Sequence, residues 1–281
     1  MYDNNDRRDS KRNFNDRDND RRGGQRDFKG NGRDNENRDN DIIFGVRSVI
    51  EAVRAGKEIN KIMIQRGMNK ELFKELKEEL ANKTYNLQFV PIQKLNRLTR
   101  KNHQGVIAFI APIAYQEIEP IVTKLFEEGE VPNIMILDRL TDVRNFGAIA
   151  RTAECTGVHA LVIVEKGGVL VTSDAIKTSA GALMRIPVCK VKDLSQVVHY
   201  LKSSGVNVVA CTEKTQNLIQ DADLTVPTAI IMGSEEDGIS TKLLAESNEK
   251  AKIPMSGEIA SLNVAVSAGI VLYESLRQRL G

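Results

Sequence analysis

The sequence predicts an α/β protein, and three observations lead to this prediction. In residues 132–281, short runs of consecutive apolar residues alternate with helical segments, which is the pattern of a parallel sheet buried on both faces. A smaller alternation of strand and helix fills residues 42–112, and residues 1–41 are almost free of apolar side chains. The chain of 281 residues therefore divides into a tail, a small α/β domain, a linker over 113–131 and a larger α/β domain.

The tail over residues 1–41 consists mainly of Asn, Asp, Arg and Gly, and its eleven Arg and Lys balance eleven Asp and Glu. Such a segment cannot bury enough apolar surface to offset the entropy of ordering, so we expect it to be disordered. Two functions fit it: an RNA-tethering arm, in which arginines are interleaved with Phe14 and Phe28, and a solvated solubility tail. The balanced charge favours the solubility tail, because its carboxylates oppose the attraction of its cations to phosphate.

The small domain opens with IIFGVRSVIEAVRAG, in which a short strand or turn leads into a helix that Gly56 stops. We expect strands at 60–65, 87–92 and 105–112, and a helix over about 69–82. The next segment, residues 115–133, is acidic and amphipathic, which predicts a connecting helix between the domains.

The larger domain alternates strand and helix along its length. Expected strands cover residues 133–138, 159–164, 185–191, 206–212, 228–233 and 251–255. One expected helix begins near residue 145, and others cover 174–182, 194–203, 240–246 and 261–279. In a parallel sheet of this kind ligands bind at the carboxyl ends of the strands, so we expect a site in the loops that follow strands.

Composition excludes some functions and leaves others open. The formal net charge of +2 is too small to predict or exclude a nucleic-acid partner, so any basic surface must be local. The three cysteines lie among apolar neighbours without a C-x-x-C spacing, which predicts buried thiols rather than disulfides. The three histidines are too scattered for a zinc site, so we expect no metal. No apolar run approaches the roughly 18 residues of a membrane span and the N-terminus is hydrophilic, so we expect a cytoplasmic protein.

The first unusual loop follows the expected strand at 133–138 and reads RLTDVRNFGAIARTAE. Asn145 can cap a helix that begins at Phe146, and Arg151 lies six residues further on. With about 3.6 residues per turn, the two side chains can border one cleft without stacking on each other. On this loop alone, a capping Asn and a solvated Arg are the simpler interpretation.

The second unusual loop, IIMGSEEDGIS at 230–240, has the spacing G-x-x-x-x-G-x-S of a phosphate-binding loop, but Ile239 occupies the lysine position. Glu235, Glu236 and Asp237 would repel phosphate, which excludes ATP or GTP binding. A turn rich in carboxylates and glycines suits a cationic or hydroxyl-bearing ligand. An ordinary acidic turn is the alternative.

The third unusual segment is IPMSGEIASLNVAVSAGIVLYE, residues 253–274. Ser261 is a good N-cap for a helix that begins at Leu262, and Asn263 places a polar side chain beside the exposed N–H groups of the first turn. The rest of the helix is mostly small and apolar, which permits close packing or an oligomer interface. A capped core helix explains Ser261 but not the IPMSG approach to it.

Together, three motifs in these loops resemble those of the SpoU/TrmH family of RNA 2'-O-ribose methyltransferases in type, order and spacing. They are N-F-G-A-I-A-R from Asn145, I-M-G-S-E-E-D-G from Ile231 and I-P-M-S-G-E-I-A-S-L-N-V-A-V-S from Ile253. The resemblance covers residues 132–281. It extends upstream to FGVRSVIEAV and NHQGVIAFI, which resemble the substrate-binding domain of the RlmB-like enzymes that modify a guanosine of 23S ribosomal RNA.

This resemblance implies a SPOUT methyltransferase domain with a deep trefoil knot, preceded by a small L30e-like substrate-binding domain. The IPMSG segment and the helix after it would form part of a knotted pocket for S-adenosyl-L-methionine, which accounts for the unusual entrance to that helix. The family is typically a homodimer through the knotted domains, and each active site can use residues of both chains. The implied partner is RNA, with 23S rRNA favoured, and no metal is implied.

The resemblance also assigns site residues, position by position. The catalytic positions are Asn145, Arg151, Glu235, Ser261 and Asn263, and the cofactor positions are Thr212, Gly233, Ile253, Met255, Leu262 and Asn263. Arg151 has been given the role of base in this family. Because a guanidinium with a pKa above about 12 rarely releases its proton, we expect Arg151 to bind the adjacent phosphate and stabilise the developing alkoxide. Asn145 and Glu235 would then orient Arg151 or the ribose.

Two other functions stay open. A tRNA ribose is the rival substrate, and the small N-terminal domain favours rRNA because minimal tRNA enzymes of this family lack it. A non-catalytic RNA-binding protein with the same fold, acting in ribosome assembly, is the rival class, and the intact polar residues of the three motifs argue against it. A dinucleotide-dependent oxidoreductase is disfavoured, because no G-x-G-x-x-G follows an expected strand.

Overall fold

The computed structural model describes residues 41–81, 85–259 and 261–281. The tail predicted over 1–41 lies outside these residues except for Asp41, and its disorder stays a prediction. In the described part of the chain, no helix is long and apolar enough to cross a membrane. Two separate sheets organise the described residues, one in each of the predicted α/β domains.

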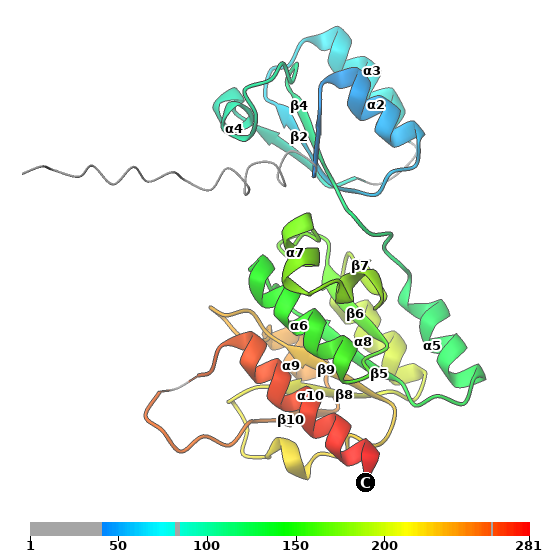
Figure 1. Cartoon of the computed structure of the whole chain (residues 1–281), viewed down its shortest axis with the longest axis vertical. Coiled ribbons are helices and arrows are strands. Elements are labelled where there is room, and N and C mark those ends of the chain that lie inside the picture. The colour runs from blue at the N-terminus through cyan, green and yellow to red at the C-terminus, as the bar shows by residue number, and fades with distance from the viewer. Residues whose placement is uncertain (1–40, 82–84, 260) are drawn as a thin grey trace, which may run out of the picture. The chain divides into compact units, whose positions relative to one another are not determined.

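The small domain is built on a four-stranded mixed sheet in the order β1-β4-β2-β3. Its strands are β1 (Ile42–Phe44), β2 (Ile59–Gln65), β3 (Leu87–Val90) and β4 (Val106–Ile110), and its helices are α2 (Val46–Arg54), α3 (Lys70–Leu80) and α4 (Ile92–Leu98). Strand β4 pairs antiparallel with both β1 and β2, whereas β2 and β3 are parallel. Helices α2 and α3 pack on one face of this sheet, and α4 packs on the other through Leu95 (Figure 1).

Helix α4 is an element that the sequence pattern does not predict. The apolar run over 87–92 predicts one strand, but β3 ends at Val90 and α4 begins at Ile92. Pro91 makes this change, since it has no N–H to donate to a strand and its fixed φ suits the entrance of a helix. Leu95 is the buried residue of α4, and a helix of seven residues is too short for its period to be distinguished in the sequence.

The larger domain contains a six-stranded sheet in the order β10-β8-β9-β5-β6-β7, and its pairings are parallel, as predicted. Its strands are β5 (Asn133–Leu137), β6 (Ala160–Val164), β7 (Val188–Val191), β8 (Asn207–Cys211), β9 (Thr228–Met232) and β10 (Glu249–Ala251). Its helices are α6 (Val143–Cys155), α7 (Ser173–Thr178), α8 (Leu194–Ser203), α9 (Thr241–Glu246) and α10 (Val264–Leu280), with short 3-10 turns at η1 (Ala182–Met184) and η2 (Ile219–Asp221). Helix α5 (Ile118–Glu127) precedes the sheet, where a connecting helix is predicted.

Helices cover both faces of this sheet, and each face has its own core. On one face, α6, α7 and α10 pack against strand residues such as Met135 and Ile230 (Figure 1). On the other face, α5, α8 and α9 pack against Ile134 and Ile231. Alternate residues of one strand therefore enter different cores, which explains why the strands are continuous apolar runs in the sequence.

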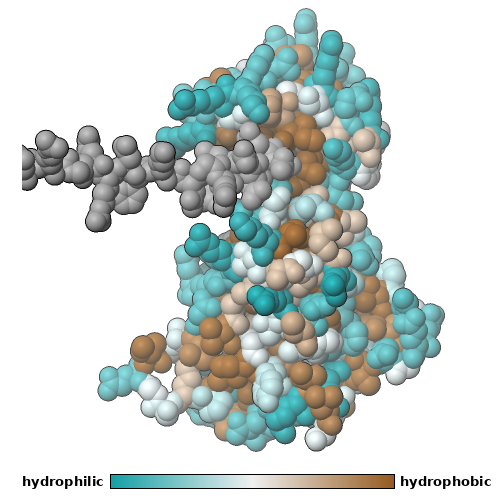
Figure 2. All heavy atoms as spheres, viewed as in Figure 1, coloured by the Kyte–Doolittle hydropathy of each residue, from teal (hydrophilic) through white to brown (hydrophobic). Residues whose placement is uncertain are grey.

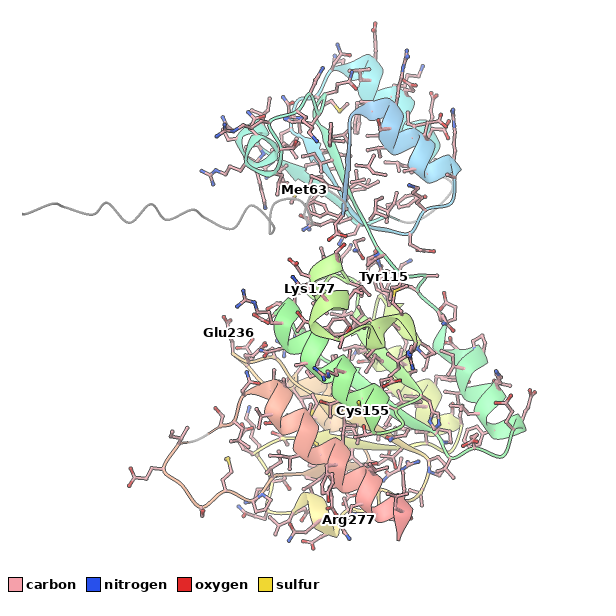
Figure 3. All side chains as sticks on the ribbon, viewed as in Figure 1. Met63, Tyr115, Cys155, Lys177, Glu236 and Arg277 are labelled. Atoms are coloured by element: carbon pink, nitrogen blue, oxygen red, sulfur yellow. The ribbon has the colours of Figure 1, made fainter. Side chains whose placement is uncertain are left out.

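One strand and one cysteine of the larger domain differ from the prediction. The strand predicted over 251–255 lies at Glu249–Ala251 instead, because Pro254 cannot donate a ladder hydrogen bond and the chain leaves the sheet before it. Cys155 is exposed rather than buried, because it ends α6 at the surface of the domain (Figure 3). The trefoil knot stays a prediction.

Candidate active site

The three unusual loops of the larger domain meet at the carboxyl edge of its sheet. Strands β5, β8, β9 and β10 are parallel and end at this edge, so the segments that follow them are neighbours. Two cavities open there, a larger one of about 820 Å³ and a smaller one of about 590 Å³. Residues 234–237, in the loop after β9, line both cavities and form the wall between them.

A chain of side-chain hydrogen bonds joins the three loops. Asn145, on α6, donates through Nδ2 to Oε1 of Glu235 at 2.8 Å. Asn263, at the start of α10, donates through Nδ2 to Oδ1 of Asn145 at 3.2 Å. The bonded residues are 90 and 118 positions apart in sequence, so the fold alone brings them together. We call this group the amide chain.

The N-cap of α10 differs from the predicted one. The helix begins at Val264, and its cap is Asn263, whose Oδ1 accepts hydrogen bonds from the backbone N–H groups of Ala265 and Val266. Ser261, the predicted cap, is exposed in the segment before the helix. An amide can cap a helix with its oxygen and still donate from its nitrogen, so one residue serves both the helix and the amide chain.

The N-cap of α6 also differs, because the helix begins at Val143 rather than at Phe146. Asp142 is the cap, and its Oδ1 accepts hydrogen bonds from the N–H groups of Arg144 and Asn145 at 2.7 and 2.8 Å. Asn145 therefore lies inside the first turn. Its side-chain amide does not cap the helix and contacts the other two loops instead.

All six cofactor positions implied by the resemblance line the larger cavity, and so does Ser261. They are Thr212, Gly233, Ile253, Met255, Leu262 and Asn263. Gly233 is the most constrained, since a Cβ there would lie 2.1 Å from the carbonyl carbon of Gly238 and 2.3 Å from the backbone nitrogen of Ile239. These neighbours are backbone atoms, so only glycine permits the close approach that shapes this wall.

Arg151 lines neither cavity in this chain. It lies on α6 with an exposed side chain, and it makes no hydrogen bond or ion pair within the ranges that the structure describes. The fold therefore gathers Asn145, Glu235, Ser261 and Asn263 at the cavities and leaves Arg151 outside them.

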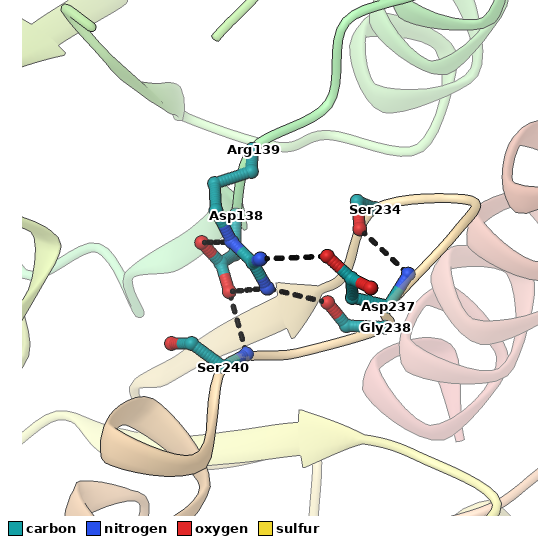
Figure 4. A network of polar contacts seen from close by, with 6 residues as sticks. All are labelled: Asp138, Arg139, Ser234, Asp237, Gly238 and Ser240. Carbon is teal, nitrogen blue, oxygen red and sulfur yellow. Dashed lines mark hydrogen bonds and ion pairs between the residues drawn. The ribbon is translucent and has the colours of Figure 1, made fainter. Parts of the chain in front are cut away.

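Arg139 holds the wall between the cavities in place through hydrogen bonds. The sequence motifs did not indicate this residue. Arg139 donates from Nε and Nη2 to the two carboxylate oxygens of Asp138, at 3.0 and 3.3 Å, and from Nη1 to Asp237 at 3.2 Å (Figure 4). Its Nη2 also donates to the Gly238 carbonyl at 3.0 Å, and the Ser240 N–H donates to Asp138 at 2.7 Å. The hydrogen bond to Asp138 raises the pKa of Arg139, so the guanidinium stays charged. We call this group the arginine clasp.

The sequence carries only a faint signal of the arginine clasp. Asp138 directly follows a buried strand, at the sheet edge where ligand sites form. Arg139 has a φ of +56°, which is uncommon for a residue with a side chain, but no sequence pattern predicts this backbone conformation. Its partner Asp237 is 98 positions away, so the contact could not be predicted from spacing.

Carboxylates dominate the charge around the larger cavity. Its charged lining residues are Glu213, Glu235, Glu236 and Asp237 against Lys214 and Lys252. Glu236 projects from the loop at this edge of the sheet (Figure 3). The excess of negative charge favours a cationic ligand and disfavours phosphate.

Cys211 also lines the larger cavity, and burial raises the pKa of its thiol to about 12. The thiol therefore stays protonated and is a poor nucleophile toward any electrophile bound beside it. No group of three or more His, Cys, Asp and Glu side chains in the described residues could hold a metal ion.

Two family models match this chain. Residues 132–273 match the SpoU rRNA Methylase family. Residues 42–116 match a family described as RNA 2'-O ribose methyltransferase substrate binding. The two matched ranges correspond to the larger and the small domain.

Relatives of known name match along most of the chain. A protein of Staphylococcus aureus (strain MSSA476), named as a TrmH family tRNA/rRNA methyltransferase, is 34% identical over 238 residues, which are 85% of this chain and 96% of the relative. YacO of Bacillus subtilis (strain 168), named in the same way, is 31% identical over 239 residues, again 85% of this chain and 96% of the relative.

Solved structures share the fold. The crystal structure of an RNA 2'-O ribose methyltransferase has a TM-score of 0.51 at 28% identity, covering 86% of this chain and 91% of that chain. The SpoU methyltransferase AviRb from Streptomyces viridochromogenes, in complex with the cofactor AdoMet, has a TM-score of 0.54 at 23% identity, covering 85% of this chain and 90% of that chain.

Proposed function

We propose that this chain, which belongs to the SpoU rRNA methylase family, transfers a methyl group from S-adenosyl-L-methionine to the 2'-hydroxyl of a guanosine ribose in 23S rRNA. The observation that carries this proposal is the amide chain of Asn145, Glu235 and Asn263. It joins the three family motifs beside the wall between two cavities, one for a methyl donor and one for a ribose.

The larger cavity fits S-adenosyl-L-methionine in size, surface and charge. Its volume of about 820 Å³ is within the roughly 300–1,000 Å³ of small-molecule sites. Met232, Ile253 and Leu262 give it an apolar surface suited to an adenine ring, and the Thr212 hydroxyl can accept or donate a hydrogen bond. Gly233 lines the cavity as well, and the surrounding carboxylates favour the positive charge of a sulfonium.

When bound, S-adenosyl-L-methionine supplies an electrophilic methyl carbon on a positively charged sulfur. We place the target ribose in the smaller cavity, across the wall formed by residues 234–237. Glu235 then accepts the proton of the 2'-hydroxyl, since Asn145 holds its Oε1 and no described residue forms a hydrogen bond with its Oε2. A 2'-hydroxyl is a weak nucleophile at neutral pH, so a positioned carboxylate next to it contributes directly to the rate.

A second copy of the chain accounts for the position of Arg151. Val266, Ile270 and Tyr273 form an apolar stripe on α10 and are 52%, 38% and 64% exposed. Their i, i+4, i+7 spacing puts them on one side of the helix, and apolar side chains reach the surface over α10 (Figure 2). Helix α6, which carries Arg151, packs beside α10 in the same core.

We therefore propose a homodimer through this α10 stripe, in which Arg151 of each protomer reaches the smaller cavity of its partner. There its guanidinium binds the phosphate next to the target ribose and stabilises the negative charge that develops on the attacking oxygen. This position agrees with its exposure and its lack of partners within the described residues of one chain.

The small domain favours ribosomal RNA over tRNA. A substrate-binding family model matches residues 42–116. The family resemblance implies that minimal tRNA enzymes lack this domain. A tRNA ribose is the alternative substrate. A non-catalytic assembly protein is disfavoured by the amide chain, because a protein that only binds RNA has no need of a held carboxylate between two cavities.

The test is to incubate the purified protein with tritiated S-adenosyl-L-methionine and total rRNA or tRNA from a strain that lacks its gene. The RNA is digested and the labelled nucleoside identified by chromatography and mass spectrometry. We expect 2'-O-methylguanosine in 23S rRNA. Label in tRNA would move the target, and no label on either RNA, with the cofactor still bound, would favour the assembly protein.

A further inference from the structure

The two faces of the small domain differ in the balance of their charges. The sequence has no Asp or Glu between Glu79 and Glu117. Within this stretch, α4 and the loop after it carry four exposed cations: Lys94, Arg97, Arg100 and Lys101. The acidic residues gather instead on α3, at Glu71, Glu75, Glu78 and Glu79. Helix α3 also carries Lys70, Lys74 and Lys77, so its charges nearly balance. Since α3 and α4 lie on opposite faces of the sheet (Figure 1), the α4 face has an excess of positive charge and the α3 face carries both signs.

The sheet itself adds a cation and two aromatic rings to the basic face. Lys61 pairs with Phe109 on the neighbouring strand, and its Nζ lies 4.5 Å from the centre of that ring. The Nζ of Lys101 lies 5.6 Å from the ring of Phe44. The pKa of Lys61 is lowered, first by burial and then by the positive charge of Lys94, so these cations are close enough to repel one another. An anionic partner would offset this repulsion.

The loop that carries Arg100 and Lys101 is held in place by a buried histidine. His103 accepts the Gly105 N–H at its Nδ1 at 3.0 Å, so its Nε2 carries the proton and donates to Oδ1 of Asn96 at 2.8 Å. A loop fixed in this way presents its cations with little loss of conformational entropy on binding.

The helix presents its cations in a similar way. Lys94 and Arg97 are three residues apart on α4, so they are neighbours on its surface, while Leu95 anchors the helix to the sheet. Within the described ranges, Lys94, Arg97 and Arg100 make no ion pair with a carboxylate. Their charge is therefore available to an external anion.

We propose that this α4 face docks the phosphate backbone of the substrate RNA at a point away from the reacting ribose. The α4 face consists of Lys61, Lys94, Arg97, Arg100 and Lys101 with Phe44 and Phe109. Charge complementarity selects RNA, since a row of cations matches a row of phosphates. The inference rests on the proposed function, because it takes RNA as the substrate. Contacts to phosphate fix position rather than sequence, so the choice of nucleotide is made elsewhere.

The test measures binding of a fluorescein-labelled hairpin of 23S rRNA by anisotropy at several salt concentrations, without cofactor. The docking variant is Lys94→Gln, Arg97→Gln and Arg100→Gln in one chain. The matched control removes three cations from the opposite face of the same domain: Lys70→Gln, Lys74→Gln and Lys77→Gln. Circular dichroism and thermal melting check that each variant is folded, and Arg97→Gln alone replaces the triple variant should that variant fail to fold.

We expect the docking variant to bind roughly tenfold or more weakly at low salt, and the slope of log affinity against log salt to fall in magnitude by about 2 to 3. Arg97→Gln alone should lower the slope by about 1. The control should keep the wild-type slope. Equal slopes for the docking variant and the wild type, or equal losses in variant and control, would overturn the proposal and leave an acidic protein as the candidate partner. Binding to RNA does not require methyl transfer. A reduced salt slope in the docking variant, together with no methylated nucleoside in the activity test, would therefore contradict the proposed function but still support RNA binding by the α4 face.

Discussion

The cavity edge of the larger domain and the α4 face of the small domain differ in charge and in origin. The cavity edge is acidic, and its amide chain joins residues 90 and 118 positions apart in sequence. The α4 face is basic, and four of its cations come from one stretch of eight residues, from Lys94 to Lys101. The residues of the cavity edge are far apart in sequence and meet only in the folded chain, whereas most cations of the α4 face are close together in the sequence.

This difference separates two physical tasks. An acidic edge favours a cationic methyl donor but repels the phosphates of an RNA, so that edge alone would hold its substrate poorly. Cations placed on another surface can attract the backbone without disturbing the charge around the donor. We therefore expect changes at the cavity edge to alter the chemical step or cofactor binding, and changes at the α4 face to alter RNA capture.

The largest effect should come from Arg151→Ala. Loss of a group that stabilises charge in the transition state lowers rates by about 10² to 10³, so turnover should fall by that factor. Cofactor affinity, measured by isothermal titration calorimetry, should stay within about twofold because Arg151 lies outside the larger cavity. Arg151→Lys should restore only part of the rate, since an ammonium lacks the planar fork of a guanidinium. A loss of cofactor binding in Arg151→Ala would instead assign the residue a structural role.

Next in size is Leu262→Asp, which places a carboxylate on the apolar lining of the larger cavity. We expect cofactor affinity to fall by about 10- to 100-fold, because the carboxylate replaces apolar surface that would contact the adenine ring and loses water when the ligand covers it. Ile259→Asp is the matched control: it adds the same charge to the same segment at a position that is 82% exposed and does not line the cavity. Equal losses in both variants would show that net charge, and not the cavity, sets the affinity.

Gly233→Ala tests the wall of the larger cavity. The added Cβ would lie 2.1 Å from a backbone atom of Gly238, so the two segments must separate. We expect a destabilisation of about 1–3 kcal/mol in urea unfolding, together with weaker cofactor binding. Gly257→Ala, in the next loop, has nothing within 4 Å of its Cβ and should change neither quantity. A fully stable Gly233→Ala variant would mean that this approach is not required.

The smallest effect should come from Arg139→Lys in the arginine clasp. Lysine keeps the charge beside Asp138 but cannot reach Asp237 and the Gly238 carbonyl at once, so the wall that carries Glu235 loosens. Turnover should fall about two- to tenfold, with a small change in melting temperature. Arg54→Lys, which alters a two-pronged arginine contact with Glu51 and Glu79 in the small domain, should leave turnover unchanged. Equal rates for wild type and Arg139→Lys would show that the clasp does not position the wall.

Much of the larger domain could be predicted from the sequence, because a strand buried on both faces is a continuous apolar run. Helix α4 could not, since it has only seven residues and Pro91 lies within a run that resembles a strand. The exposure of Cys155 depends on where its helix ends, which the sequence does not fix within a residue or two.

Some of the site residues could likewise be predicted from the sequence, and others could not. Ser261 and Asn263 are both good caps, and the contact between Asn263 and Asn145 selects one of them only in the folded chain. The motifs indicated that Glu235 belongs to the site. The motifs gave no sign of Arg139, because its partners lie in a distant loop.

The separation of tasks is tested most directly by single-turnover methylation over a range of RNA concentrations, with saturating cofactor. The wild type is compared with Arg151→Ala and with the triple docking variant of α4. We expect the docking variant to need at least about tenfold more RNA but to reach a plateau within roughly threefold of the wild type. Arg151→Ala should reach a plateau about 10² to 10³ below it at any RNA concentration. A docking variant with an equally low plateau, or recovery of Arg151→Ala at high RNA, would contradict the assignment of chemistry to one region and RNA capture to the other.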